Sequence, residues 1–297
     1  MSLCSLKMNS RKLMLPVEVN IIMPEIPHTW KKSPKEFYDC GEKYKVLWLL
    51  HGATGDSWTW IHNTNLMRYA EEKNLIVVMP NALNSDYANH PEFANGYYYT
   101  DFFFEELMPM IFGWFPASEK REDNFISGMS MGGSGTLLLG FRHPEKFGGI
   151  APISASLRES KFLKPYADFS AEEFRKMASV EPEKFPSEYE EGGITYKEIN
   201  MIAKYDTVRA YLDSYECMWE RFPELVLAGN LPEIYFCCGT KEVCYPKIME
   251  FKEYAESLGV HNIIYDVNSG YGHDFAFWDI AIQKIIHWIF KESSAEK

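Results

Sequence analysis

Residues 124–133 read Asn-Phe-Ile-Ser-Gly-Met-Ser-Met-Gly-Gly, and an apolar repeat of three leucines follows at 137–139. A short apolar run therefore leads into Ser130, which has Gly128 and Gly132 two residues away on either side. A serine that attacks a carbonyl group has to stand on a sharp turn between a strand and a helix, where glycines remove Cβ atoms that would clash. The stretch predicts a nucleophile elbow with Ser130 as the catalytic residue, and a structural Gly-Ser turn is the alternative.

Short apolar runs, as expected of strands buried on both faces of a sheet, recur along the chain. They lie at 46–50, 75–79, 125–126, 149–153, 234–238 and 263–267. Helical patterns separate them, such as Tyr245 to Leu258, which has Pro246 in its first turn and Gly259 just past its end. Strands that alternate with helices predict an α/β fold with a mostly parallel, doubly wound sheet of about eight strands.

An early hairpin is expected ahead of this series. The segment from Val17 to Met23 alternates between apolar and polar residues and ends at Pro24, so we expect it to pair with the segment around Leu3 to Met8.

One later segment interrupts the alternation of strands and helices. Residues 156–231 show no clear strands but contain two capping-box sequences, Ser170 with Glu173 and Thr195 with Glu198.

The break in the pattern divides the chain. We expect a core made of residues 1–155 and 232–297, with residues 156–231 inserted as a helical cap over the active site. A packing appendage that lies away from the site is the alternative.

Catalysis by a serine needs a base, and His273 is the histidine in a suitable position. It lies in the glycine-rich loop at 269–274, after the final predicted strand and before the C-terminal helix. His143 and His287 fall in helical patterns and His261 begins a strand, so these three are expected to be structural. We therefore predict that His273 is the general base, and a surface loop histidine is the alternative.

The third member should be an acid between the serine and the histidine, because this type of fold carries them in the order Ser, Asp or Glu, His. No aspartate occurs between Asp213 and Asp266, so Glu242, which follows the strand at 234–238, is the predicted acid. A solvated glutamate beside Lys241 is the alternative reading. Asp266 and Asp274 are the reserve candidates.

Attack on a carbonyl also needs N–H donors for the oxyanion. One is expected from Met131, the residue after the nucleophile, and the other from the loop at 51–56 that follows an earlier strand. Ala53 is the preferred donor and Gly52 a near alternative, while His51 is expected to order the loop. The glycine spacings of dinucleotide and phosphate sites do not occur, and no metal motif is recognisable, so no cofactor and no metal are expected.

The composition limits the classes of partner that we expect. The chain has 30 basic and 42 acidic residues and a net charge of −12, and its basic clusters are only pairs, so neither nucleic acid nor a membrane surface is an expected partner. Aromatic residues make up 15% of the chain, and three tryptophans, Trp58, Trp60 and Trp278, are candidates for lining a substrate pocket.

The N-terminal sequence and the cysteines give expectations about the cellular location of the protein. Lys7, Arg11 and Lys12 interrupt any apolar run, so no secretory signal is recognisable and a cytoplasmic location is expected. No apolar stretch is long enough to span a bilayer. The six cysteines show no Cys-x-x-Cys spacing and are expected to be free thiols; the adjacent Cys237 and Cys238 should point to opposite faces of a strand.

A set of motifs, taken together, resembles the esterase D group of α/β-hydrolases, which includes S-formylglutathione hydrolases, feruloyl and acetyl esterases, and small bacterial tributyrin esterases. The motifs are residues 49–52 with Gly55 and Trp58, 77–81, 128–133, His143-Pro144 with Phe147, 238–240, and 272–274 with Trp278. The tributyrin esterases are the closest in appearance. The resemblance implies the α/β-hydrolase fold and short acyl chains as substrates. Two features depart from the group: Glu242 stands where aspartate is usual, and the insertion is long.

These observations predict a serine carboxylesterase that hydrolyses short-chain acyl esters through an acyl-enzyme intermediate. The expected partner is a small-molecule ester, and a homo-oligomer is left open. A thioesterase of the S-formylglutathione hydrolase type, with cationic groups at its pocket mouth, is the nearer alternative. A non-catalytic binding module on the same fold is the farther one.

Overall fold

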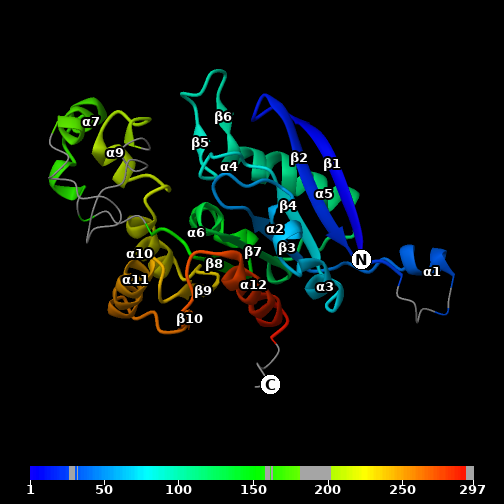
Figure 1. Cartoon of the computed structure of the whole chain (residues 1–297). Coiled ribbons are helices and arrows are strands. Elements are labelled where there is room, and N and C mark those ends of the chain that lie inside the picture. Colours follow the sequence, from blue (N-terminus) through cyan, green and yellow to red (C-terminus); the bar gives the residue numbers. More distant parts are fainter. Residues whose placement is uncertain (27–30, 32, 158–160, 162, 181–201, 292–297) are drawn as a thin grey trace.

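The computed structural model describes residues 1–26, 31, 33–157, 161, 163–180 and 202–291 (Figure 1). Within these residues, eight strands form one sheet in the order β1-β2-β4-β3-β7-β8-β9-β10. The strands are β1 Ser2–Ser10, β2 Leu15–Met23, β3 Val46–Leu50, β4 Ile76–Pro80, β7 Asn124–Met129, β8 Gly149–Ile153, β9 Glu233–Gly239 and β10 Ile264–Asn268. All neighbours from β4 to β10 pair in parallel, which confirms the predicted sheet.

The N-terminal hairpin is the antiparallel part of the sheet. β1 pairs with β2 from Ser2 opposite Met23 to Ser10 opposite Leu15, and β2 pairs antiparallel with β4. Side chains of β1 alternate between partly buried and exposed, as expected of an edge strand with one face against the protein. The predicted early hairpin is confirmed.

Buried side chains of the central strands separate into two apolar clusters, one on each face of the sheet. In β3, Val46, Trp48 and Leu50 belong to the first cluster and Leu47 and Leu49 to the second. Cys238 and Cys237 divide in the same way, as the alternation of side chains along a strand requires. The continuous apolar runs in the sequence are therefore strands that are covered on both faces.

Helices cover both faces of the sheet. The first face is packed by α4 Tyr99–Phe102, a π-helical turn at Phe103–Leu107, α5 Met108–Trp114, α6 Met131–Arg142, α10 Met218–Ala228 and α11 Tyr245–Ser257. The second face is packed by α2 Thr59–Asn63, α3 Leu66–Glu71 and α12 Phe275–Ile289. A further short helix, α1 Pro34–Tyr38, has no buried residues and projects from the body in Figure 1. No helix in the described part of the chain is long and apolar enough to cross a membrane.

The segment 156–231 is helical where it is described. It holds a 3-10 turn at Lys164–Tyr166, α7 Ala171–Val180, α9 Val208–Leu212 and α10. The capping box at the start of α7 is formed: Ser170 Oγ accepts from the Glu173 N–H at 3.2 Å, and the Glu173 carboxylate accepts from the Ser170 N–H at 3.0 Å. The second predicted box, Thr195 with Glu198, lies outside the described residues.

This segment divides in its packing. Apolar residues in two described stretches, Leu163 to Ala178 and Ile202 to Cys217, form a third apolar cluster of their own, which includes Phe174. Helices α7 and α9 of these stretches lie to one side of the sheet in Figure 1. By contrast, α10 packs through Phe222 into the first cluster of the main body. The end of the insertion therefore doubles as one of the helices that cover the sheet.

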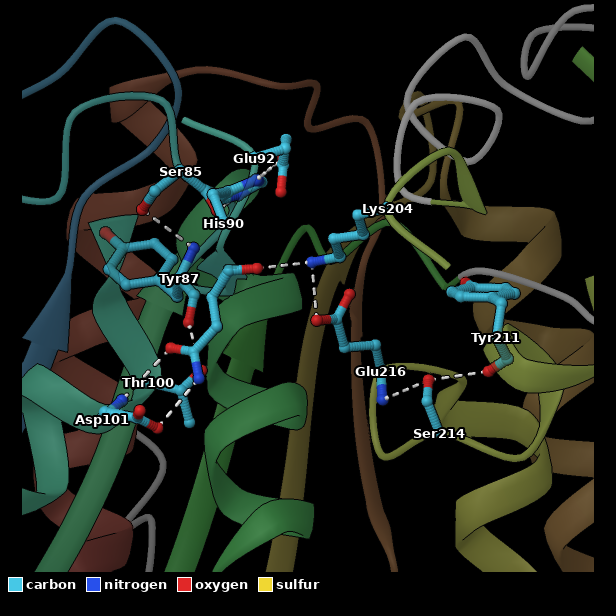
Figure 2. A network of polar contacts seen from close by, with 11 residues as sticks. Ser85, Tyr87, His90, Glu92, Thr100, Asp101, Lys204, Tyr211, Ser214 and Glu216 are labelled. Carbon is cyan, nitrogen blue, oxygen red and sulfur yellow. Dashed lines mark hydrogen bonds and ion pairs between the residues drawn. The ribbon is translucent and has the colours of Figure 1, made fainter. Parts of the chain in front are cut away.

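A buried ion pair within the segment 156–231 also contacts the body, through the backbone of Asn89 (Figure 2). Lys204 Nζ lies 2.6 Å from Glu216 Oε1 and donates to the backbone carbonyl of Asn89 at 2.8 Å, and the two charged side chains are 4% and 2% exposed. Asn89 belongs to β5, Asn89–His90, which pairs with β6, Tyr97–Tyr98, in a small hairpin. The hydrogen bond from Lys204 to the Asn89 carbonyl therefore joins this segment to the hairpin. Removing either charge of the ion pair would leave the other charge buried without compensation.

Candidate active site

Ser130 stands on the turn between β7 and α6. Its φ and ψ angles are 55° and −118°, a backbone conformation that residues other than glycine rarely adopt. Its N–H donates to the Ile153 carbonyl at 3.0 Å, which continues the pairing of β7 with β8 beyond the strand. The serine is thus held in a strained turn at the carboxyl edge of the sheet, as a nucleophile elbow requires.

The glycines around Ser130 permit close contact with the end of β3. A Cβ atom on Gly132 would lie 2.6 Å from the Leu50 carbonyl oxygen and 2.7 Å from that of His51. A Cβ atom on Gly128 would lie 2.6 Å from the Gly132 carbonyl oxygen. Any side chain at these positions would therefore push the elbow away from the loop that follows β3.

His273 and Glu242 meet at the same edge of the sheet. His273 lies between β10 and α12, and its Nδ1 is 2.8 Å from Oε2 of Glu242, which lies between β9 and α11. Because an ionised carboxylate only accepts, the Nδ1–H of the imidazole is the donor. The Glu242 side chain is fully buried while that of His273 is 44% exposed, so one ring edge remains open to a substrate.

The two reserve carboxylates have other partners. Lys284 Nζ lies 3.0 Å from both carboxylate oxygens of Asp266. Asp274 caps the N-terminus of α12, where its Oδ1 accepts from the Phe277 N–H at 3.1 Å. The structure therefore brings Glu242, and neither Asp266 nor Asp274, to Nδ1 of His273.

Two further side chains, Ser154 and Trp278, hold this pair; the sequence predicted Trp278 only as a pocket residue and did not point to Ser154. Ser154, directly after β8, donates from Oγ to Glu242 Oε1 at 2.9 Å and accepts from Trp278 Nε1 at 2.9 Å. The Gly239 N–H donates to the same Oε1 at 2.8 Å. The Trp278 ring also meets the His273 ring edge to face, with 4.9 Å between centroids. No motif marks Ser154; its position at the end of a central strand is the signal that could have found it.

Cys244 adds a donor on the other oxygen of Glu242. Its Sγ lies 3.5 Å from Oε2 and 3.7 Å from the Cys238 Sγ. The hydrogen bond with Cys238, together with burial, raises the pKa of the Cys244 thiol. The thiol is therefore protonated at neutral pH and donates to the carboxylate.

Ser130 and His273 reach the same edge from strands that are three positions apart. β7, β8, β9 and β10 are consecutive parallel neighbours, and Ser130, Ser154, Glu242 and His273 follow them in that order. Among the described residues, no hydrogen bond joins the side chains of Ser130 and His273. Catalytic hydrogen bonds are often long in ligand-free structures and tighten when substrate binds.

The loop after β3 lies against the elbow. A Cβ atom on Gly52 would be 3.5 Å from the Ser130 Cβ, and Ala53 is the next residue. The Thr54 N–H donates to Asn84 Oδ1 at 2.8 Å, and Gly55 N–H donates to the Gly52 carbonyl at 3.1 Å, so this loop has a defined conformation. Met131 opens α6, and a first-turn N–H has no acceptor within its own helix.

His51 fixes that loop. Its ring is buried, and Nε2 accepts from the Ala82 N–H at 2.9 Å, so the proton is on Nδ1, which donates to the Gly52 carbonyl at 2.7 Å. Burial lowers the pKa of His51, which keeps the ring neutral. Tyr87 OH donates to the His51 carbonyl at 2.7 Å, and burial raises the pKa of Tyr87 well above its usual value. His51 is thus a structural part of the loop.

The free energy of unfolding should depend on pH because His51 titrates differently in the folded and unfolded chain. Since the folded pKa lies below the unfolded value of about 6.5, the unfolded chain binds the extra proton first, and stability falls as pH drops below about 6.5. One such proton corresponds to about 1.4 kcal/mol per pH unit until the folded pKa is reached. Urea unfolding of the parent and His51→Gln between pH 5 and pH 8 measures it. Equal pH slopes for the two proteins would contradict this account.

The three tryptophans predicted to line a pocket have different surroundings. Trp60 is buried in the second apolar cluster and its Nε1 donates to the Leu50 carbonyl at 2.9 Å, so the prediction for Trp60 is wrong: the ring packs in the core, where its N–H finds a backbone acceptor. Trp58 donates to Glu18 on β2 and stacks on His62. Trp278 is the one that contacts His273.

Known proteins are similar to this chain over a range that includes all of the candidate site residues. Residues 32–289, from before β3 to the end of α12, match the family model described as "Putative esterase". An acetyl esterase of Caldicellulosiruptor saccharolyticus is 25% identical over 253 residues, which make up 85% of each chain.

Solved structures agree. A fluorophosphonate-binding serine hydrolase of Staphylococcus aureus superimposes with a TM-score of 0.71 and 25% identity, over 97% of this chain and 98% of that one. The S-formylglutathione hydrolase of Staphylococcus aureus gives a TM-score of 0.69 and 25% identity over the same shares. The similarity therefore includes every strand whose end carries a candidate residue.

Proposed function

Because the chain belongs to the esterase family, within its esterase D-like group, we propose that it is a serine carboxylesterase that hydrolyses esters with short acyl chains. The observation that carries the proposal is the contact of 2.8 Å between His273 Nδ1 and the buried Glu242. These residues follow β10 and β9 at the sheet edge where Ser130, with a φ angle of 55°, follows β7. A base oriented by a buried acid near a strained serine is the arrangement that makes a hydroxyl nucleophilic.

The proposed reaction is acyl transfer to water. Ser130 attacks the ester carbonyl while His273 takes its proton, and His273 then gives that proton to the departing alcohol, which leaves an acyl-enzyme. Water, deprotonated by His273, attacks the acyl group and releases the acid and the free serine. Glu242 holds the tautomer of His273 and stabilises the imidazolium in each step.

The oxyanion would be held by the N–H groups of Met131 and Ala53. Support comes from the contact between the elbow and the loop after β3, and from the anchoring of that loop by His51 and Tyr87. Donors that are fixed before reaction stabilise the developing charge without a cost of reorganisation, which contributes about 3–4 kcal/mol per donor in known cases. Trp278 would form a wall beside His273.

The segment 156–231 would act as a cap that selects substrates. Its own apolar cluster and its link through Lys204 to the β5-β6 hairpin support this role. The division of the chain into a core of 1–155 and 232–297 and this cap belongs to the proposal. So does a cytoplasmic location, which is in keeping with six cysteines that are all free thiols.

Hydrolysis of chromogenic p-nitrophenyl esters of graded chain length tests the proposal. The purified chain should have its highest kcat/KM with the acetyl and butyryl esters, and a lower value with long acyl chains that the covered site would exclude. Comparable rates with dodecanoyl and acetyl esters would contradict the short-chain assignment. The absence of hydrolysis of every ester would contradict the carboxylesterase assignment itself.

A thioesterase is the second candidate, because an S-formylglutathione hydrolase superimposes over 97% of this chain. Such a substrate carries charged groups on its thiol part and needs cations near the site. Lys241, exposed beside Glu242, is a cation on the loop that meets Tyr271 near His273. Parallel assays with S-formylglutathione and p-nitrophenyl acetate would rank the two functions by kcat/KM.

A further inference from the structure

Two buried thiols lie beside the acid of the candidate triad. Cys238, near the end of β9, and Cys244, at the start of α11, approach to 3.7 Å between sulfurs, and Cys244 Sγ lies 3.5 Å from Glu242 Oε2. One ligand atom from each of the three side chains falls within 4.8 Å of the others. The spacing Cys-x-x-x-Glu-x-Cys matches no common metal motif, so only the folded chain reveals the cluster.

These separations fit a small d¹⁰ cation. Zinc binds thiolates at about 2.3 Å and carboxylate oxygens at about 2.0–2.2 Å. A tetrahedral arrangement with these bond lengths separates two sulfurs by about 3.8 Å and a sulfur from an oxygen by about 3.5–3.6 Å. The two separations that involve Cys244, 3.7 Å and 3.5 Å, match these values, and the third pair of ligand atoms lies within 4.8 Å.

We propose that Cys238, Cys244 and Glu242 form a binding site for one thiophilic divalent cation of the Zn²⁺ and Cd²⁺ class, and that occupancy of this site inhibits the enzyme. On binding, the cation replaces the two thiol protons, which pass to solvent, and forms two metal–sulfur bonds and one bond to Glu242 Oε2. The ligands then carry three negative charges against two positive ones. Two soft sulfur ligands select such ions over Mg²⁺ or Ca²⁺.

Inhibition follows from a shared oxygen. Glu242 Oε2 is also the atom that accepts the hydrogen bond from His273 Nδ1. A cation on that oxygen draws its negative charge away from the imidazole, and the imidazolium loses stabilisation in each proton transfer. This consequence rests on the proposed function, whereas binding of the cation does not.

Exposed residues alternate with the buried ligands. In the loop that joins the two cysteines, Thr240, Lys241 and Val243 are exposed while Glu242 and Cys244 are buried. The ligands therefore lie on or next to a loop that is partly open to solvent. Cys40, which is exposed, and Cys217, which is buried in the insertion cluster, are matched controls elsewhere in the chain.

Titration with Cd²⁺ and Zn²⁺ of the purified full chain, kept reduced by a phosphine, tests the proposal with two readouts. The first is the ultraviolet sulfur-to-cadmium charge-transfer band, which should saturate at one ion per chain and should not appear with Mg²⁺. The second is hydrolysis of p-nitrophenyl acetate, which should decline with the same midpoint and recover when a chelator is added.

Variants decide between this site and others. Cys238→Ala and Cys244→Ala should each weaken metal binding at least about tenfold, the lower bound for loss of even an outer-shell partner, while Cys40→Ala and Cys217→Ala should bind as the parent does. Cys238→Ser and Cys244→Ser, which keep the side-chain size, are second variants if alanine impairs folding. An unchanged cadmium band in these variants would overturn the site. Unchanged inhibition with a lost band would mean that the inhibiting ion binds elsewhere, at His273 for example. A band in a chain that hydrolyses no ester would support the site and reject the proposed function.

Discussion

Replacing Ser130 with alanine should lower kcat for a short acyl ester by about 10⁶-fold, as removal of a triad nucleophile does. The hydroxyl oxygen forms the bond to the acyl group, and no neighbouring side chain on this turn can take over that bond. Residual hydrolysis would come from binding and from the oxyanion donors alone. The measurement is steady-state hydrolysis of p-nitrophenyl acetate, together with labelling of the parent and the variant by a fluorophosphonate.

Ser134 provides the matched control. It lies four residues later in α6, and its Oγ donates to the Ser156 carbonyl at 3.0 Å. Ser134→Ala should keep the activity and the covalent label within a few-fold of the parent. A fully active Ser130→Ala, or a label that moves to another residue without loss of activity, would reject the nucleophile.

Glu242→Gln should reduce kcat by about 10⁴-fold with little change in KM, as neutralising a triad acid does. The amide keeps the shape of the side chain but removes the charge that stabilises the His273 imidazolium, and it can present N–H where Oε2 now accepts. Glu242→Asp should recover part of the rate, because charge is restored at a shorter reach. Thermal unfolding of each variant separates this effect from loss of structure.

The other two carboxylates test the assignment. Asp266→Asn weakens the contact with Lys284, and Asp274→Asn keeps a residue that can cap α12, so both should remain within about tenfold of the parent. A loss with Asp266→Asn or Asp274→Asn as large as that with Glu242→Gln would transfer the acid role to that residue.

The strands and their order along the chain could be predicted from local sequence patterns. Residues 46–50 and 76–80 are continuous apolar runs because both of their faces are covered, and such runs are visible without any tertiary information. The order Ser, acid, histidine likewise narrowed the acid to Glu242 before any distance was known. The structure then supplied the contact of 2.8 Å to His273.

What the patterns could not give depends on contacts between distant segments. Ser154 and Glu242 are 88 residues apart, and Trp278 is 124 residues from Ser154, so their hydrogen bonds exist only once β8, β9 and α12 are packed together. The prediction for Trp60 failed for the same reason, since a tryptophan on a short helix has the same local sequence whether it faces a pocket or the core. The packing of α10 on the sheet was hidden within a segment that reads as one insertion.

The Lys204 contact defines the piece of this protein that can be exchanged between relatives. A chimera that receives a foreign segment in place of residues 156–231 would lose both Lys204 and Glu216, and the Asn89 carbonyl would lose its charged donor. The β5-β6 hairpin would then keep a surface shaped for a partner it no longer has. Under the proposed cap role, the unit for transplanting substrate preference is therefore residues 156–231 together with residues 89–98, two stretches that lie far apart in the chain and are joined by the Lys204 contact.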